Sequence, residues 1–119
     1  MVCSGVLVEY KCSDIFAQFL KEHQITKVFG IVGAGDAHLF DSISRLGYTE
    51  IISVHHEQAA VMAAGAYYRA SGRLSAAIVT TGAGSTNAVT GVVSNFMDSI
   101  PCLIISGNEK AIHCGSDNP

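Results

Sequence analysis

Apolar residues follow helical spacing in four segments of the chain and form short continuous runs between them. The helical spacing predicts helices from an N-cap at Ser13 and Asp14 to about residue 23, from about 39 to 46, over 57–71 and over 85–97. The runs predict strands over 27–32, 51–54, 76–80 and 101–106. Strands that alternate with helices and are apolar on both faces favour an α/β three-layer sandwich, in which helices cover both faces of a mainly parallel sheet.

We expect residues 1–119 to form a single domain, because no internal repeat or linker interrupts this pattern. Gly47 and Gly72 follow the second and third predicted helices, where glycine commonly ends a helix. The segment 107–119 is polar and irregular, and four strands make a thin sheet. The domain is therefore expected to be incomplete at its C-terminus, either as a fragment of a longer polypeptide or with its remainder on another chain.

The chain contains few charged residues for its length. Lys and Arg number 7 and Asp and Glu 10, or 14% of the sequence, whereas an average domain has about 25%. These charged side chains are too few to cover a surface that is fully exposed to solvent. We therefore expect part of the exterior to be buried against a partner. The basic residues are scattered, and no apolar stretch approaches the roughly 20 residues of a membrane span, which argues against nucleic-acid and membrane binding.

The four cysteines show neither metal-binding nor disulfide-framework spacing. Cys3, Cys12, Cys102 and Cys114 form no CxxC pair. Free thiols in a reducing cytoplasm are the expectation. A zinc site built from His113, Cys114 and a distant cysteine is the alternative, although the usual ligand pairs are absent.

Two glycine turns follow predicted strands, at the end of the sheet where α/β folds bind ligands. The first is GIVGAG (30–35) and the second is TTGAGSTN (80–87). Neither completes a dinucleotide fingerprint, because His38 and Asn87 stand where the third glycine would be. Each turn could bind a ligand or could simply allow a strand to enter a helix.

A polar cluster, HHEQ (55–58), lies at the end of the second predicted strand. Glu57 could stabilise the first turn of the following helix, or it could share a proton with a ligand nitrogen. The helix dipole should lower its pKa and burial should raise it. If the strand continues through the adjacent His55 and His56, these side chains point to opposite faces of the sheet, so at most one of them is expected to face a site there.

Five motifs in order resemble the amino-terminal, pyrimidine-binding domain of thiamine-diphosphate enzymes, with the acetolactate synthase and carboligase branch most similar. They are VFGIVG (28–33), HEQAA (56–60), GAYYRASG (65–72), TGAGSTN (81–87) and MDSIP (97–101). The resemblance extends from about residue 14 to 107 and implies the three-layer fold of that domain.

The resemblance implies that Glu57 hydrogen-bonds N1′ of the cofactor's aminopyrimidine and so activates it for ylide formation. It places further cofactor contacts, largely through backbone groups, on the two turns: Val32, Gly33, Thr81, Gly82 and Asn87. The implied cofactor is thiamine diphosphate with Mg²⁺, and the implied substrate is a small 2-keto acid.

The family supplies its Mg²⁺ and diphosphate ligands from a carboxyl-terminal domain with a Gly-Asp-Gly…Asn-Asn motif, which this sequence lacks. No metal ligand is therefore assigned here, and the chain alone is expected to be inactive. The resemblance also implies a homodimer or tetramer, with the active site formed between this domain and a diphosphate-binding domain. We expect the stripe of Ala60, Ala63, Ala64 and Tyr67 to make the closest of these contacts.

The sequence departs from the family pattern at the first turn. Val32 stands where proline is frequent, and Ala34 where the decarboxylase branch has a catalytic aspartate, which favours a carboligase. We interpret Asp36 as a solvated helix N-cap rather than as a substitute acid. Decarboxylases also carry a His-His pair, where this chain has only His113 and Cys114. The alternatives are a subunit of a split 2-keto acid decarboxylase, a Rossmann-like nucleotide-binding module and a noncatalytic dimerisation module.

Overall fold

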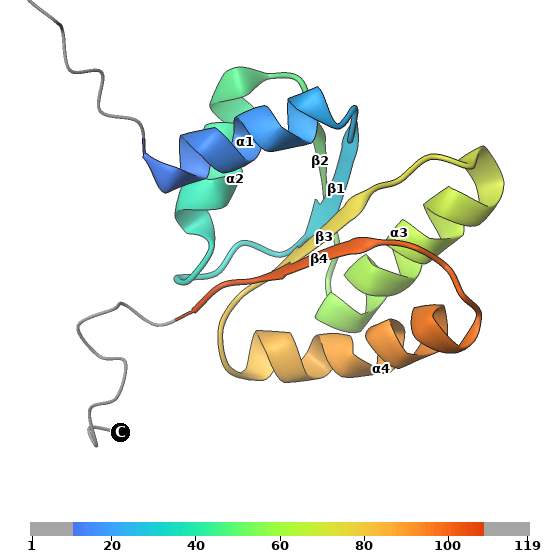
Figure 1. The fold of residues 1–119 in the computed structure, drawn as a ribbon. Helices are drawn as coiled ribbons and strands as arrows, with labels where there is room; N and C mark the ends of the chain where they lie inside the picture. The colour runs from blue at the N-terminus through green and yellow to red at the C-terminus, as the bar shows by residue number, and fades with distance from the viewer. Residues whose placement is uncertain (1–10, 109–119) are drawn as a thin grey trace, which may run out of the picture.

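Helices and strands alternate along residues 11–108, the part of the chain that the computed structural model describes. The elements in order are α1 (Cys12–Glu22), β1 (Lys27–Gly30), α2 (Ala37–Leu46), β2 (Glu50–Ser53), α3 (Glu57–Ser71), β3 (Ala76–Val79), α4 (Ala83–Met97) and β4 (Leu103–Ser106) (Figure 1). Every predicted helix and strand is present, and the alternation is confirmed.

The sheet has four strands in the order β2-β1-β3-β4, and all neighbours are parallel. Val28 of β1 pairs with Ile51 on one side and with Ala76 on the other. All four strands therefore end at the same edge of the sheet. The strand order reverses between β1 and β3, so the loops that follow these strands flank the point where open α/β sheets bind ligands.

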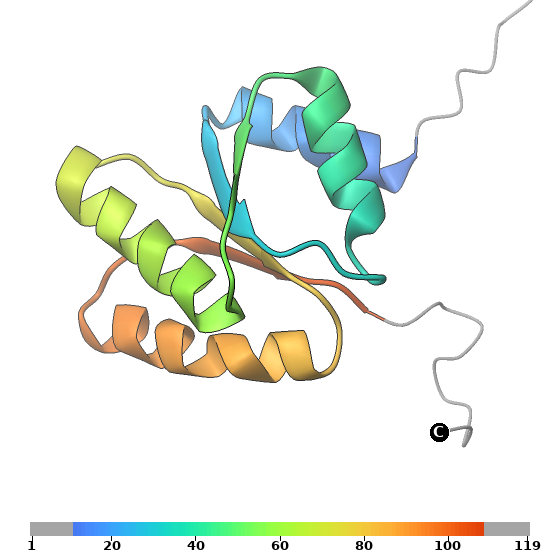
Figure 2. The ribbon, with the colours of Figure 1, turned by 180° about the vertical axis from the view of Figure 1, so that it is seen from behind.

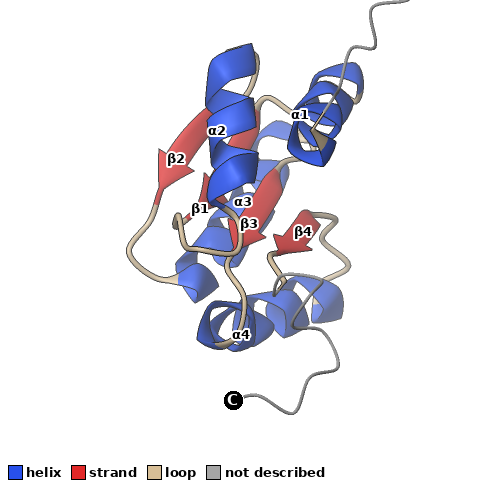
Figure 3. Ribbon diagram, turned by 90° about the vertical axis from the view of Figure 1, so that its left-hand side faces the viewer, coloured by secondary structure: helices blue, strands red, loops and turns tan. Residues whose placement is uncertain are grey.

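Each face of the sheet carries one pair of helices, which confirms the three-layer sandwich. Helices α1 and α2 lie on one face and α3 and α4 on the other (Figures 2 and 3). Side chains alternate along the strands: Val28 and Ile78 enter the cluster under α1 and α2, while Phe29 and Val79 enter the cluster under α3 and α4. The continuous apolar runs of the sequence thus supply two cores.

Several elements begin or end at other residues than predicted. Strands β1 and β3 end at Gly30 and Val79, and β4 begins only at Leu103. Helix α4 begins at Ala83 rather than at residue 85, because Gly82 precedes it with a φ of 65°, a conformation that glycine adopts readily. The early ends of β1 and β3 leave longer loops at the ligand-binding edge of the sheet.

The interpretation of Ser13 and Asp14 as an N-cap is wrong, because both residues lie within α1. Lys11 occupies the N-cap position of α1, with no side-chain capping bond. Ser13 is buried instead, and its Oγ accepts a 2.9 Å hydrogen bond from the hydroxyl of Ser42 on α2. Packing between the two helices has overridden the capping preference that the residue type suggested.

The alanine stripe of α3 does not form an outer contact surface. Ala60 and Ala64 are fully buried within the domain, and Ala63 and Tyr67 pack against the same core. The two most exposed large apolar side chains, Phe96 and Met97, lie instead on α4. Together with Val89, Val92 and Val93 they form a surface that we call the α4 outer face.

Candidate functional site

Two glycine turns meet at the carboxyl edge of the sheet, and Thr80 at the end of β3 joins them. The Gly35 N–H donates a 3.2 Å hydrogen bond to Thr80 Oγ1. A Cβ added at Gly33 would lie 2.5 Å from Thr80 Cβ, and one added at Gly84 would lie 2.8 Å from Thr80 Cγ2. Glycine is therefore required in both turns, because the Thr80 side chain occupies the space between them.

Glu57, the first residue of α3, lies beside the second of these turns. Asn87 of α4 donates a hydrogen bond from Nδ2 to Glu57 Oε2 over 3.0 Å. A Cβ added at Gly84 would lie 3.2 Å from Glu57 Oε1. The sequence singled out Glu57 and Asn87 separately, and the fold brings them into direct contact.

The Asn87 hydrogen bond lowers the pKa of Glu57, and the backbone N–H of Glu57 acts in the same direction. Burial opposes these effects but is the weaker influence. Of the two opposing effects expected from the sequence, stabilisation of the charged form prevails. At neutral pH the carboxylate is ionised and can accept a hydrogen bond from a ligand N–H.

The two histidines before Glu57 are not in a strand, because β2 ends at Ser53. The expectation that they point to opposite faces of a sheet is therefore wrong. His56 is the N-cap of α3, and its Nδ1 accepts a 3.2 Å hydrogen bond from the Gln58 N–H. This contact gives His56 a structural role at the start of the helix that carries Glu57.

The remaining predicted cofactor contacts lie on the same two turns. Val32 is 56% exposed on the first turn. Thr81 is half-buried, and its Cγ2 would lie 3.3 Å from a Cβ added at Gly35. Gly82 is exposed at the N-cap position of α4. Both turns thus present groups at the edge that carries Glu57.

Asp36 is not a solvated N-cap. Its side chain is 1% exposed and makes no capping bond to α2. It turns back into the first turn, where Oδ1 accepts a 2.6 Å hydrogen bond from the Gly33 N–H. The sequence pattern indicated a helix N-cap at Asp36 and placed Thr80 in the second turn, but nothing in the sequence indicated that both residues hold the first turn from opposite sides.

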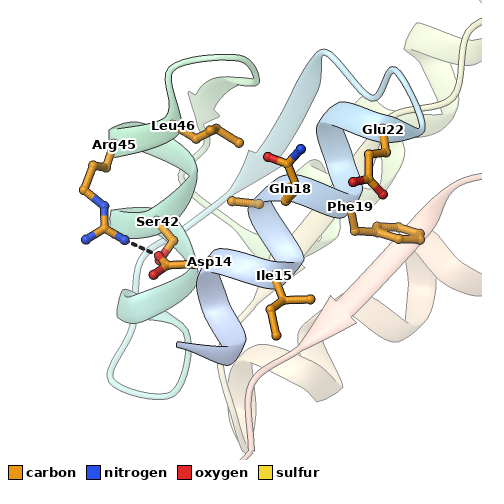
Figure 4. Close-up of a pocket in the computed structure, with 9 residues that line it drawn as sticks. Asp14, Ile15, Gln18, Phe19, Glu22, Ser42, Arg45 and Leu46 are labelled. Carbon is orange, nitrogen blue, oxygen red and sulfur yellow. Dashed lines mark hydrogen bonds and ion pairs between the residues drawn. The ribbon is translucent and has the colours of Figure 1, made fainter. Parts of the chain in front are cut away.

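A groove of about 780 Å³ lies between α1 and α2 and shares no residue with this edge (Figure 4). Ile15, Phe19 and Leu46 supply its apolar surface. Asp14 and Arg45 form an ion pair across it. The Ser42 hydroxyl lowers the pKa of Asp14, and Arg45 reinforces that effect. We place the candidate site at the sheet edge, because the groove contains none of the residues singled out for chemistry.

Metal-ligating residues do not cluster within 11–108: no group of three or more His, Cys, Asp or Glu could hold an ion there. Cys12 and Cys102 are free thiols. The alternative zinc site at His113 and Cys114 lies outside the described residues. None of the four described helices is long and apolar enough to cross a membrane.

Residues 10–118 match the family model for the thiamine pyrophosphate enzyme, N-terminal TPP binding domain. The acetolactate synthase large subunit of Haemophilus influenzae is 40% identical over 105 residues, which are 88% of this chain and 18% of that protein. The large subunit of acetolactate synthase isozyme 3 of Escherichia coli is 34% identical over the same shares. The mitochondrial acetolactate synthase of Schizosaccharomyces pombe is 36% identical over 87% of this chain and 16% of that protein.

The chain thus spans less than a fifth of the length of these curated relatives. The match to the family model, by contrast, extends over residues 10–118, a range that includes both glycine turns and Glu57. The chain belongs to the thiamine pyrophosphate enzymes and corresponds to their N-terminal TPP-binding domain.

Proposed function

We propose that this chain supplies the pyrimidine-binding half of the active site of an acetolactate synthase-like carboligase that acts on 2-keto acids. The observation that carries the proposal is the ionised Glu57 carboxylate, held by Asn87 at the sheet edge where the two glycine turns meet. The match to the TPP-binding family favours this function over a dinucleotide-binding module.

The donors and acceptors at this edge fit an aminopyrimidine. Glu57 supplies the acceptor that a protonated ring nitrogen needs, and Val32, Thr81 and Gly82 place backbone amide and carbonyl groups on the adjacent turns. Gly33 contributes the absence of a side chain, because its own N–H is bonded to Asp36. When bound, thiamine diphosphate supplies a carbon nucleophile for addition to the keto group. The role of Glu57 is to share a proton with N1′.

Proton sharing requires a higher pKa than Glu57 has in this chain. Asn87 holds the pKa of Glu57 below its usual value while solvent still reaches the residue. A bound ring and a covering domain would exclude that solvent, and burial raises the pKa of a carboxyl group. Assembly would therefore convert Glu57 from a simple anion into a group that holds a proton.

We assign Mg²⁺ and the diphosphate to a domain on the same or another chain. The relatives, of which this chain covers 18% or less, have ample length for such a domain. The α4 outer face offers an uncharged apolar surface for a homodimer or tetramer. In this proposal the chain alone neither holds the cofactor tightly nor turns over substrate.

The first turn favours a carboligase over a decarboxylase. Ala34 is exposed on this turn and has no acidic group to offer, and the curated relatives described above are acetolactate synthases. The free thiols of Cys12 and Cys102 fit a reducing cytoplasm.

The test is Glu57→Gln in the complete assembly, which joins this chain to its diphosphate-binding domain. Glutamine keeps the size of the side chain but cannot give or take the proton, so C2–H exchange of the bound cofactor, followed by NMR in D₂O, should slow by about 10²–10⁴-fold. Glu22→Gln, an exposed change on α1, is the matched control and should leave exchange unchanged. Near-normal exchange in the Glu57 variant would refute the proposal.

A further inference from the structure

Asp36 carries a buried oxygen for which the fold provides no partner. Its side chain is 1% exposed, and Oδ1 accepts the Gly33 N–H. Within residues 11–108, Oδ2 is the one buried side-chain oxygen or nitrogen without a hydrogen-bond partner. Burial of a carboxyl oxygen without a hydrogen-bond partner is unfavourable. Packing alone therefore does not account for the position of Asp36.

The Asp36 side chain acts on the turn and not on the helix that it precedes. An aspartate at an N-cap usually accepts from the amides of the first helical turn, but this one makes no such bond. It binds the N–H of Gly33, while the carbonyl of Gly33 accepts a 3.1 Å bond from the Ala37 N–H. Both polar groups of Gly33 are thereby fixed by residues at the start of α2.

Thr80 holds the same turn from the other side. Its Oγ1 accepts the Gly35 N–H, and its Cβ lies where a side chain at Gly33 would be. The turn is clamped between α2 and β3, and Val32 and Ala34 are left exposed on it. Such a clamp keeps the exposed backbone in one conformation before any ligand arrives.

We propose that Asp36 is a positioning residue of the cofactor site, which fixes the turn over residues 33–35 against Thr80 so that its backbone meets the aminopyrimidine in one preformed geometry. This inference rests on the proposed function. Asp36 acts through Gly33 and touches neither cofactor nor substrate.

The hydrogen bonding of Asp36 predicts which residue can replace it in holding the turn. Burial raises the pKa of Asp36, while the Gly33 N–H and the backbone N–H of Asp36 oppose that rise. The Asp36 side chain contacts the turn through Oδ1, which accepts the Gly33 N–H, so we expect the turn to need this accepting oxygen rather than the charge. Asparagine keeps this oxygen and the shape of the side chain and carries no charge, whereas alanine leaves the Gly33 N–H unpaired.

The experiment compares Asp36→Ala with Asp36→Asn in the complete assembly. Asp36→Ala should raise the dissociation constant of thiamine diphosphate by about tenfold or more, the loss expected when the Gly33 N–H is left without its acceptor. The KM of the 2-keto acid should change far less. Asp36→Asn should bind the cofactor almost as the parent does, and so should Asp41→Ala, the same change at an exposed position of α2.

Amide hydrogen exchange in the 119-residue chain reports the clamp without any cofactor. Gly33 should exchange faster in Asp36→Ala and at the parent rate in Asp36→Asn. Thr80→Val, which keeps the volume but removes the acceptor of the Gly35 N–H, should accelerate exchange at Gly35 and weaken cofactor binding in the same direction. It keeps the test decisive if Asp36→Ala does not fold.

The inference is overturned if Asp36→Ala, or Thr80→Val in its place, binds the cofactor normally. Equal weakening by Asp36→Asn and Asp36→Ala would overturn it as well, because the charge and not the accepting oxygen would then matter. The proposed function fails on a different result: a parent assembly that binds no thiamine diphosphate, or normal C2–H exchange in Glu57→Gln.

Discussion

The two faces of the sheet are covered in opposite ways. Under α1 and α2 the core consists of large side chains, among them Leu20, Phe40 and Ile43. Under α3 and α4 it consists largely of alanine, and the helices approach so closely that a Cβ added at Gly91 would lie 2.7 Å from Val61 Cβ. One face is stabilised by bulk and the other by close approach.

The outer surfaces of the two helix pairs differ as well. Helix α1 carries Asp14, Lys21 and Glu22, and α2 carries Asp41 and Arg45. The sequence of α4, AGSTNAVTGVVSNFM, contains no charged residue, and Phe96 on it is 80% exposed. The shortage of charge in the sequence is therefore concentrated on one helix, which is where we expect a partner to lie.

The largest predicted effect tests the bulky face. Leu20 is fully buried, so Leu20→Ala should remove apolar contacts, leave a cavity and lower the free energy of unfolding by about 2–5 kcal/mol. Urea denaturation measures this loss. Ile15→Ala, on the same helix but 59% exposed, should cost about 0.5 kcal/mol or less. Similar losses of stability at both positions would show that large buried side chains do not stabilise the core under α1 and α2.

A smaller effect tests close approach. Gly91→Ala places a methyl group against Val61 and should cost about 1–3 kcal/mol. The change Val61→Gly removes the Cβ that this methyl group would meet, so the double variant should be more stable than the sum of the two single effects predicts. Urea denaturation of the parent, the two single variants and the double variant measures the coupling energy between positions 61 and 91. Strict additivity would mean that α3 and α4 are not in tight contact at this point.

A substitution on the α4 outer face is expected to have the smallest effect on the stability of the chain but a large effect on its assembly. Phe96→Ser should change the free energy of unfolding by no more than about 0.5 kcal/mol, because its side chain is already exposed. It should nevertheless lower the mass of the complete assembly in sedimentation velocity. Ile15→Ser on α1 is the control and should leave the mass unchanged. If only Ile15→Ser dissociates the assembly, the interface lies on the side of the sheet that α1 and α2 cover.

Local signals in the sequence were sufficient for the helices and strands themselves. Gly47 and Gly72 end α2 and α3 with φ values of 68° and 67°, a conformation that glycine alone adopts without strain. Ser13 was misplaced because its polar side chain satisfies an inter-helix contact that spacing does not reveal. The strand order was equally out of reach, since it depends on which helices pack on which face.

In the candidate site, too, some features follow from local sequence signals and others depend on tertiary contacts. Glu57 and Asn87 could be singled out by residue type and resemblance, but their hydrogen bond joins positions 30 residues apart and depends on how α3 packs against α4. Asp36 was misjudged because aspartate before a helix usually points to solvent, and its inward rotamer follows from the fold of the turn. Tertiary contacts, which no local pattern contains, decide both points.

The position of Thr80 between the two glycine turns also limits how this domain can evolve. A side chain at Gly33 or at Gly84 would collide with the same threonine, so neither turn can acquire a new side chain through a single substitution. Every residue except glycine at position 80 keeps the Cβ that a side chain at Gly33 would meet, and glycine would lose the acceptor for the Gly35 N–H. New specificity at this edge should therefore arise by mutation of the exposed positions 32 and 34, which are free to vary without disturbing the clamp.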